Sequence, residues 1–276
     1  MENIKLVAID LDETLLRSDL TISGHTREAL RQVRARGVAV TICTGRMFRS
    51  AQPFAEQLGF DIPLITYGGA LIKNARSGEV LYYRLLETEV ARQVIRFGRE
   101  RGIQVNYYLL NGADDDLYAE LITRWGENYD SFARVPLYRV ADLETLLDTS
   151  NPLKLLLIED GPAIDGILLE LRGMIGEQAH LAKSKPRFLE VDHPEATKGR
   201  ALHELADWMQ IDRSQVMAIG DNFNDLEMLE FAGLGIAVAN APAEVQACAD
   251  HVTASNNEDG VALALERFVL DHDVAR

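Results

Sequence analysis

The stretch Val7–Leu16 constrains this chain more than any other, because an apolar run ends there in two aspartates one residue apart. Residues 4–9 are apolar except for Lys5, and so short a run predicts a buried strand of a parallel sheet. Asp10 and Asp12 stand at the mouth of that strand. Two carboxylates about 4 Å apart repel each other by roughly 4 kcal/mol at an effective dielectric of about 20. The sequence therefore predicts a cation or a shared proton at this place.

Length and composition limit the class of protein. The 276 residues suffice for one large or two medium domains, and 47% hydrophobic with 26% charged residues is typical of a globular chain. No apolar run approaches about 18 uncharged residues, and no signal-peptide pattern precedes the first strand, so we expect a cytoplasmic protein without a membrane partner. The net charge of −15 opposes binding to nucleic acids. Cys43 and Cys248 indicate neither a disulfide framework nor a zinc site.

Strand and helix patterns alternate at both ends of the chain. Strands are expected over residues 4–9, 38–43, 63–66, 215–219 and 235–239, and helices over residues 26–36, 47–58, 198–209, 226–231 and 259–270. Helices of this length between short strands favour right-handed crossovers and a parallel sheet covered on both faces. The pattern predicts an α/β fold with a doubly wound, Rossmann-like core.

The middle of the chain has a different character, because its strands and helices do not lead into acidic or phosphate-type turns. We predict an inserted α+β domain over residues 85–187, which divides the core into residues 1–84 and 188–276. Within the insertion, the acidic run Asp114–Asp116 is expected in a solvated loop, followed by a helix that ends at Tyr129.

Polar residues that suit one another follow the core strands. They are Asp10 and Asp12 after the first strand, Thr44 after the second, and Asp221, Asn224 and Asp225 after a later one, while Lys198 begins a helix. In open α/β sheets the site lies beyond the carboxyl ends of the strands. Mg²⁺ takes hard oxygen ligands and keeps substrate phosphate in its shell, so this set favours a magnesium-dependent phosphoryl site.

These residues resemble a known family. The segments Asp10–Leu16, Thr44–Arg46, Lys198-Gly199 and Gly220–Asp225 are similar to motifs I to IV of the haloacid dehalogenase superfamily. The insertion resembles the large cap of its Cof-type subgroup of sugar-phosphate phosphatases, so the resemblance covers essentially the whole chain. It departs at Gly68, where the subgroup usually has asparagine.

The resemblance implies a role for each motif residue. It makes Asp10 the nucleophile that becomes an aspartyl phosphate, and Asp12 the acid and base that protonates the leaving alcohol and deprotonates water. It places Mg²⁺ on the carboxylates of Asp10 and Asp221 and on the backbone carbonyl of Asp12. The substrate-binding residues that it implies are Thr44, Gly45, Arg46, Lys198 and Asn224. Asp225 either supports the metal ligands through a hydrogen bond or caps a helix, and Arg46 either contacts substrate or solvates the edge of the site.

We therefore expect an enzyme, a Mg²⁺-dependent phosphatase whose partner is a small phosphorylated metabolite such as a sugar phosphate. Two alternatives remain open. A hexose phosphomutase of the same superfamily would yield a positional isomer, and a non-enzymatic phospho-sensing protein would keep a phosphoaspartate without turnover. The inserted domain is expected to set specificity, with Tyr107, Tyr108 and Trp125 as candidate contacts.

Overall fold

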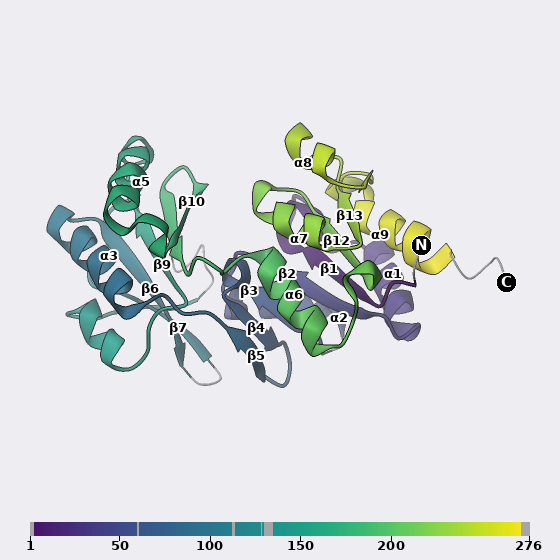
Figure 1. Cartoon of the computed structure of the whole chain (residues 1–276), viewed down its shortest axis with the longest axis horizontal. Helices are drawn as coiled ribbons and strands as arrows, with labels where there is room; N and C mark the ends of the chain where they lie inside the picture. Colours follow the sequence, from purple (N-terminus) through teal and green to yellow (C-terminus); the bar gives the residue numbers. More distant parts are fainter. Residues whose placement is uncertain (1–2, 60, 112–113, 128, 130–134, 272–276) are drawn as a thin grey trace. The chain divides into compact units, whose positions relative to one another are not determined.

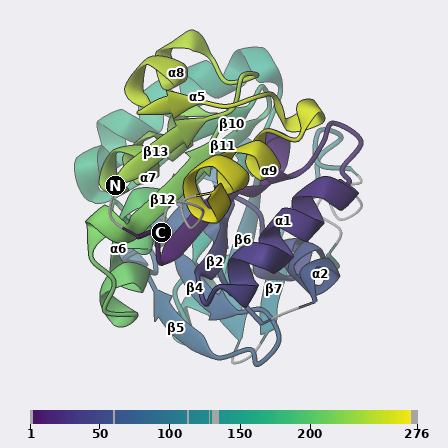
Figure 2. The same ribbon diagram turned by 90° about the vertical axis from the view of Figure 1, so that its right-hand side faces the viewer.

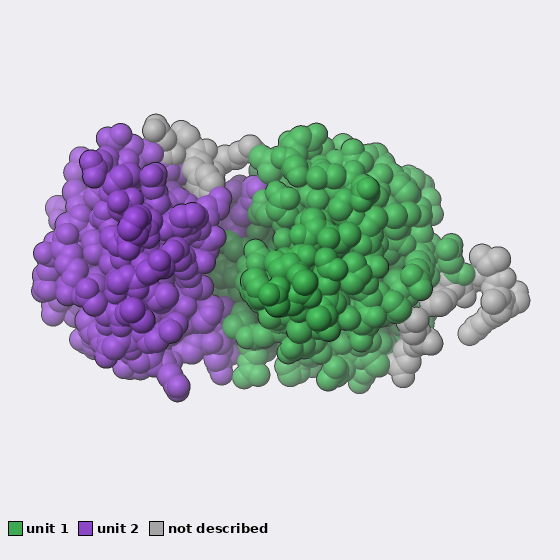
Figure 3. Space-filling view, turned by 90° about the horizontal axis from the view of Figure 1, so that it is seen from above, with its two compact units in different colours: residues 1–45, 51–82, 197–276 green, residues 46–50, 83–196 purple. Residues whose placement is uncertain are grey.

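The computed structural model describes residues 3–59, 61–111, 114–127, 129 and 135–271. The chain divides into two compact units (Figure 3): unit 1 comprises residues 1–45, 51–82 and 197–276, and unit 2 comprises residues 46–50 and 83–196. The boundary expected after residue 187 would separate two strands that pair with each other, β10 (His180–Lys185) and β11 (Phe188–Asp192). The chain leaves unit 2 after residue 196 instead.

Unit 1 is built on an eight-stranded sheet with the order β14-β13-β12-β1-β2-β3-β4-β5 (Figure 1). The strands are β1 (Leu6–Asp10), β2 (Ala39–Cys43), β3 (Pro63–Thr66), β4 (Leu71–Asn74), β5 (Val80–Tyr83), β12 (Val216–Gly220), β13 (Leu234–Ala237) and β14 (His251–Val252). Neighbouring strands from β14 to β3 are parallel, and β4 runs antiparallel to β3. All residues of β1 are buried, as its continuous apolar run predicts for a central parallel strand.

Helices cover both faces of this sheet (Figure 2), because α1 packs with α9 on one face and α6 with α7 on the other. The helices of the core are α1 (Gly24–Ala35), α2 (Phe48–Leu58), α6 (Lys198–Trp208), α7 (Leu226–Phe231), α8 (Ala243–Cys248) and α9 (Gly260–Leu265). Ser23 caps α1, since its Oγ accepts from the backbone N of Thr26 at 3.0 Å. The doubly wound α/β core is confirmed.

Unit 2 contains a six-stranded sheet with the order β10-β11-β9-β6-β7-β8. Its further elements are α3 (Thr88–Arg101), α5 (Gly161–Ile175), β6 (Gln104–Asn111), β7 (Asp114–Ala119), β8 (Leu137–Arg139) and β9 (Lys154–Ile158). Apolar residues of α3 and α5 pack on one sheet face, against alternate strand residues such as Val105, Leu155 and Leu189. No helix in the described part of the chain is long and apolar enough to cross a membrane.

The acidic run of unit 2 differs from its predicted structure. Asp114–Asp116 begins β7, where a loop was expected, and residues 120–127 form turns and irregular chain where a helix was expected. Aspartate disfavours strands, but β7 pairs antiparallel with β6 along its length, and Arg49 forms an ion pair with Asp116 at 3.6 Å. Tertiary pairing therefore overrides the local preference here.

Candidate active site

Asp10 is the last residue of β1, so the buried strand carries its carboxylate to the edge of the sheet. Only 5% of Asp10 is exposed, and its Oδ1 accepts a hydrogen bond from Lys198 Nζ at 2.5 Å. Burial raises the pKa of Asp10 well above its usual value, although the Lys198 ammonium opposes the rise. The carboxylate thus lies where additional positive charge would be favourable.

Lys198 is the first residue of α6 and connects two carboxylates. Besides Asp10, its Nζ donates to Asp225 Oδ1 at 2.5 Å, and only 2% of Lys198 is exposed. Burial disfavours the ammonium, but these two carboxylates together hold the pKa of Lys198 above its usual value. The other oxygen of Asp225 accepts from the backbone N of Asp221 at 3.0 Å and of Asn222 at 2.9 Å. Asp225 therefore fixes both the lysine and the chain after β12.

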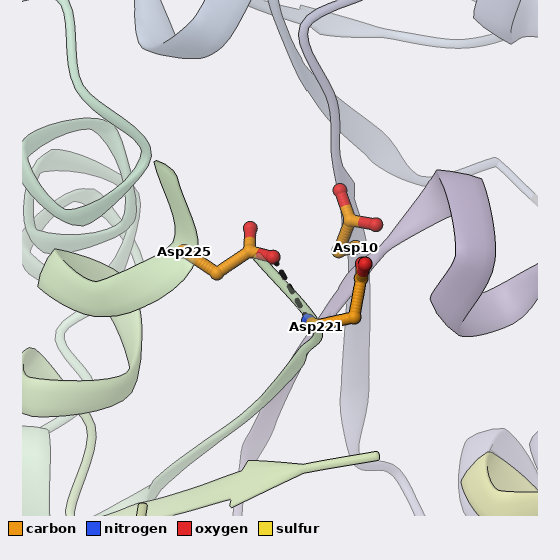
Figure 4. Close-up of side chains that lie close together, drawn as sticks. All are labelled: Asp10, Asp221 and Asp225. Atoms are coloured by element: carbon orange, nitrogen blue, oxygen red, sulfur yellow. Dashed lines mark hydrogen bonds between the residues drawn. The ribbon is translucent and has the colours of Figure 1, made fainter. Parts of the chain in front are cut away.

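Asp221 directly follows β12 and faces the same cluster. Its Oδ1 accepts from the hydroxyl of Thr14 at 2.8 Å. Burial raises the pKa of Asp221 to about 6, with a smaller contribution from Asp225. Asp10, Asp221 and Asp225 each offer a carboxylate oxygen, and these atoms lie within 4.8 Å of one another (Figure 4).

This donor set fits a divalent cation. If all groups are ionised, the three carboxylates and the one ammonium of Lys198 leave two negative charges in a buried place. Hard oxygen donors of this kind suit Mg²⁺ better than soft metals. The charge balance and the donor chemistry thus agree with the cation that the sequence predicts.

Two glycines beside the charged residues allow close packing. A Cβ on Gly220 would lie 2.7 Å from the side chain of Asp225, and a Cβ on Gly199 would lie 2.5 Å from the side chain of Glu227 on α7. Only glycine therefore lets the Asp225 carboxylate and the start of α6 take these positions. Both glycines and Thr14 lie within the motif segments, but the sequence alone predicts no role for them.

Thr44 follows β2 and is joined to the end of β3. It is 2% exposed, its backbone N donates to Ile65 O at 2.8 Å, and its carbonyl accepts from Gly68 N at 3.0 Å. Gly68 has φ +66° and ψ 8°, a left-handed conformation that glycine and asparagine adopt most readily. An asparagine at this position would tolerate the same conformation, so glycine in its place requires no change of backbone. Gly69 has φ +119°, and a Cβ there would collide with the carbonyl of Thr197, next to Lys198.

The remaining predicted site residues lie outside the carboxylate–lysine cluster. Asp12 is half-buried in the turn Leu11–Leu15, and Asn224 is exposed in the turn Phe223–Asp225. Gly45 is half-buried at the end of a segment of unit 1, whereas Arg46 begins the short segment that belongs to unit 2. The predicted site residues that the structure brings into one cluster are thus Asp10, Lys198, Asp221 and Asp225.

The three aromatic candidates of unit 2 differ in their surroundings. Tyr107 belongs to the apolar core beneath α3 and α5, so it is a wrong candidate for meeting a sugar; its pKa is raised by burial. Tyr108 points to the opposite face, where its hydroxyl lies 2.5 Å from that of Tyr129. Trp125 stacks with the guanidinium groups of Arg124 and Arg187, at 4.3 Å and 4.5 Å from its ring.

We compared the chain with known protein families and proteins. Residues 7–265 match the model of the haloacid dehalogenase-like hydrolases. The chain is 32% identical to the protein named "Putative phosphatase YxeH" of Bacillus subtilis (strain 168), over 96% of this chain and 98% of that protein. It is 30% identical to YitU, a 5-amino-6-(5-phospho-D-ribitylamino)uracil phosphatase of the same organism, over 95% and 97%.

The fold agrees with solved structures. A haloacid dehalogenase-like hydrolase from Bacteroides thetaiotaomicron superposes with a TM-score of 0.86 at 30% identity, covering 96% of this chain and 99% of that one. The chain belongs to the haloacid dehalogenase-like hydrolases, in their Cof-type branch of phosphatases.

Proposed function

We propose that this protein is a Mg²⁺-dependent phosphatase that hydrolyses small phosphorylated metabolites through an aspartyl phosphate on Asp10. The observation that carries the proposal is the buried arrangement of Lys198 between Asp10 and Asp225, with Asp221 beside them. A phosphate ester brings negative charge, so its site needs fixed cations and oriented groups more than covalent chemistry. This arrangement offers one fixed ammonium and a carboxylate set that fits a divalent ion.

The reaction that we propose has two steps. In the first, an oxygen of the Asp10 carboxylate attacks phosphorus, the bond from phosphorus to the alcohol oxygen breaks, and Asp12 gives that oxygen its proton. In the second, Asp12 takes a proton from water as the water oxygen attacks phosphorus. The bond from phosphorus to Asp10 then breaks, which releases phosphate and restores the carboxylate. Lys198 orients Asp10 throughout, because its Nζ holds one of the two carboxylate oxygens.

Each remaining site residue is proposed to bind the cation or the phosphate. The carboxylates of Asp10 and Asp221 and the backbone carbonyl of Asp12 would hold Mg²⁺. The bound ion would supply positive charge beside the non-bridging phosphoryl oxygens. The proposed phosphate ligands are Thr44, Gly45, Arg46, Lys198 and Asn224. Asp225 is proposed to keep Lys198 and the chain after β12 in place, which its three hydrogen bonds support.

We infer that the leaving alcohol is polyhydroxylated, as in a sugar or sugar-alcohol phosphate. YitU is named for a phosphorylated ribityl substrate. In unit 2, the sheet face opposite α3 and α5 carries Tyr108, Lys154 and Asp192, which pair directly across three neighbouring strands. All three residues are at most 5% exposed, and Asp192 Oδ1 has no hydrogen-bond partner among the described residues, so this polar face has a carboxylate oxygen to offer a sugar hydroxyl. We therefore propose the inserted domain as the part that selects the substrate.

A panel of phosphorylated metabolites assayed with and without Mg²⁺ tests this proposal. We expect Mg²⁺-dependent phosphate release that is fastest with sugar or sugar-alcohol phosphates and that is abolished in Asp10→Asn. Asp207→Asn is a matched control, because the Asp207 side chain is 72% exposed on α6. A positional isomer without phosphate release would favour a phosphomutase. A phosphoprotein that persists without turnover would favour a sensor.

A further inference from the structure

The turn that carries Asp12 has an unusual backbone. Within Leu11–Leu15, Glu13 has φ +60° and ψ 8°, although it is not glycine. A residue with a side chain adopts this left-handed conformation at a cost, and it keeps the conformation only where its surroundings hold it. This conformation reverses the chain between Asp12 and Thr14, whose hydroxyl donates to Asp221.

Two asparagine side chains hold this turn. Asn240 Nδ2 donates to the carbonyl of Glu13 at 2.8 Å, and Asn256 Nδ2 donates to the carbonyl of Leu16 at 2.9 Å. The two asparagines are also joined, since Asn240 Oδ1 accepts from the backbone N of Asn256 at 2.9 Å. We call these two side chains the amide clamp. It grips the turn at two carbonyls, one on each side of Thr14.

The clamp comes from the edge of the sheet in unit 1. Asn240 follows β13, and Asn256 follows β14, the neighbouring strand. Asn256 is only 4% exposed, so its amide is a buried part of the loop, whereas Asn240 lies at the surface and is held by its two hydrogen bonds. Neither residue belongs to the motifs that carry the proposed chemistry.

We propose that the amide clamp is a positioning device for the acid–base residue Asp12, an inference that rests on the proposed function. Asp10, Lys198 and Asp221 are fixed by other contacts, through β1, α6 and the chain after β12. Loosening the clamp therefore frees Asp12, including its proposed cation-binding carbonyl, and the neighbouring Thr14, whereas Asp10, Lys198 and the proposed phosphate ligands keep their own contacts. The proton-transfer steps become slower while substrate binding changes little.

The decisive variants are Asn240→Ala and Asn240→Asp. The aspartate keeps the oxygen that accepts from Asn256 but loses the donor to Glu13. We expect kcat to fall roughly 10- to 100-fold in both, as for a misplaced acid–base group, with KM changed less than about twofold. Asn257→Ala is the matched control, because Asn257 contacts Ser18, beyond the turn, at 2.9 and 3.1 Å. Its kcat should equal that of the wild type.

A suppressor distinguishes positioning from general stability. Glycine adopts the left-handed conformation without strain, and the Glu13 side chain that it removes accepts only a long bond of 3.4 Å from Asn256 Nδ2, so Glu13→Gly added to Asn240→Ala should recover most of the lost kcat. The proposal would be overturned if Asn240→Ala lowers both kcat and the free energy of unfolding and Glu13→Gly restores neither. An unchanged kcat in Asn240→Ala would overturn it as well.

Amide hydrogen exchange of residues 11–16 gives a readout that needs no activity. Exchange should be faster in Asn240→Ala than in the wild type and slower again when Glu13→Gly is added. If the wild type releases no phosphate, the proposed function fails, yet unchanged exchange in Asn240→Ala would still refute the clamp by itself.

Discussion

At the scale of single residues, the charge balance of the site depends on Lys198. Its ammonium lies between two buried carboxylates, so Lys198→Met leaves Asp10 and Asp225 without a counter-charge. We expect the free energy of unfolding to fall by about 3–5 kcal/mol, as when one partner of a buried ion pair is removed. We expect kcat to fall at least about 100-fold, because a charge that stabilises the transition state is lost. Urea denaturation beside a phosphate-release assay measures both.

A second substitution separates the two effects. Lys198→Met combined with Asp225→Asn removes one of the uncompensated carboxylates, and part of the lost stability should return while the rate does not. Full stability in the single variant would show that Lys198 is not the counter-charge that its contacts indicate.

The site residues that could be predicted from the sequence are polar residues that stand directly after apolar runs. Asp10, Thr44 and Asp221 directly follow apolar strands, and that position alone suggests a site at the sheet edge. Thr14 and Gly220 give no such signal, because their importance lies in a hydrogen bond and a close approach that exist only in the folded chain. Asn240 and Asn256 could not be predicted as site residues for the same reason, because their contacts with the turn exist only in the folded chain.

At the scale of elements, the contact between α6 and α7 depends on Gly199. A Cβ there would lie 2.6 Å from the backbone carbonyl carbon of Glu227, so Gly199→Ala pushes the two helices apart. We expect a loss of about 1–3 kcal/mol of stability, the usual cost of overpacking. Gly166→Ala on α5 is the control, since nothing lies within 4 Å of its Cβ, and it should be neutral or stabilising by up to about 1 kcal/mol. Thermal or urea unfolding of both variants compares them.

The contact between α1 and the end of α9 should depend on pH. His25 Nε2 lies 2.7 Å from Glu266, and this hydrogen bond raises the pKa of His25, assisted by Asp259. A raised folded-state pKa gives stability that is fully present below about pH 6.5 and is lost as the pH rises through the folded-state pKa. The stability difference between wild type and His25→Gln should therefore shrink over that window. Urea denaturation across pH measures this difference. Glu266→Gln should make the pH dependence smaller, with Asp259 keeping a part of it.

Element type could be predicted where periodicity and local capping agree, as in α1 and β1. The prediction was wrong at β7, because pairing with β6 and the ion pair from Arg49 are tertiary effects that three consecutive aspartates do not reveal. The boundary expected after residue 187 also depends on a tertiary effect, the pairing of two strands. No change of composition marks the pairing of β10 with β11.

At the scale of the whole molecule, a cation that binds only the folded chain must stabilise it. With Mg²⁺ at about 100 times its dissociation constant, the gain should be about 2.7 kcal/mol, visible as a higher melting temperature. Asp221→Asn should lose this gain because a carboxylate of the buried cluster is missing. The exposed Asp207→Asn should keep it. An equal rise in all three proteins would mean that Mg²⁺ acts elsewhere.

The proposed phosphatase reaction requires Asp10 to carry the phosphoryl group. The most direct test is acid-quenched mass spectrometry of the wild type mixed with Mg²⁺ and its best sugar phosphate, read on the peptide that contains Asp10. We predict that this peptide gains one phosphoryl group before phosphate release reaches its steady state, and that Asp10→Asn gains none. Phosphate released by the wild type without any phosphorylated peptide at any quench time, or the same peptide mass in both proteins, would contradict the account.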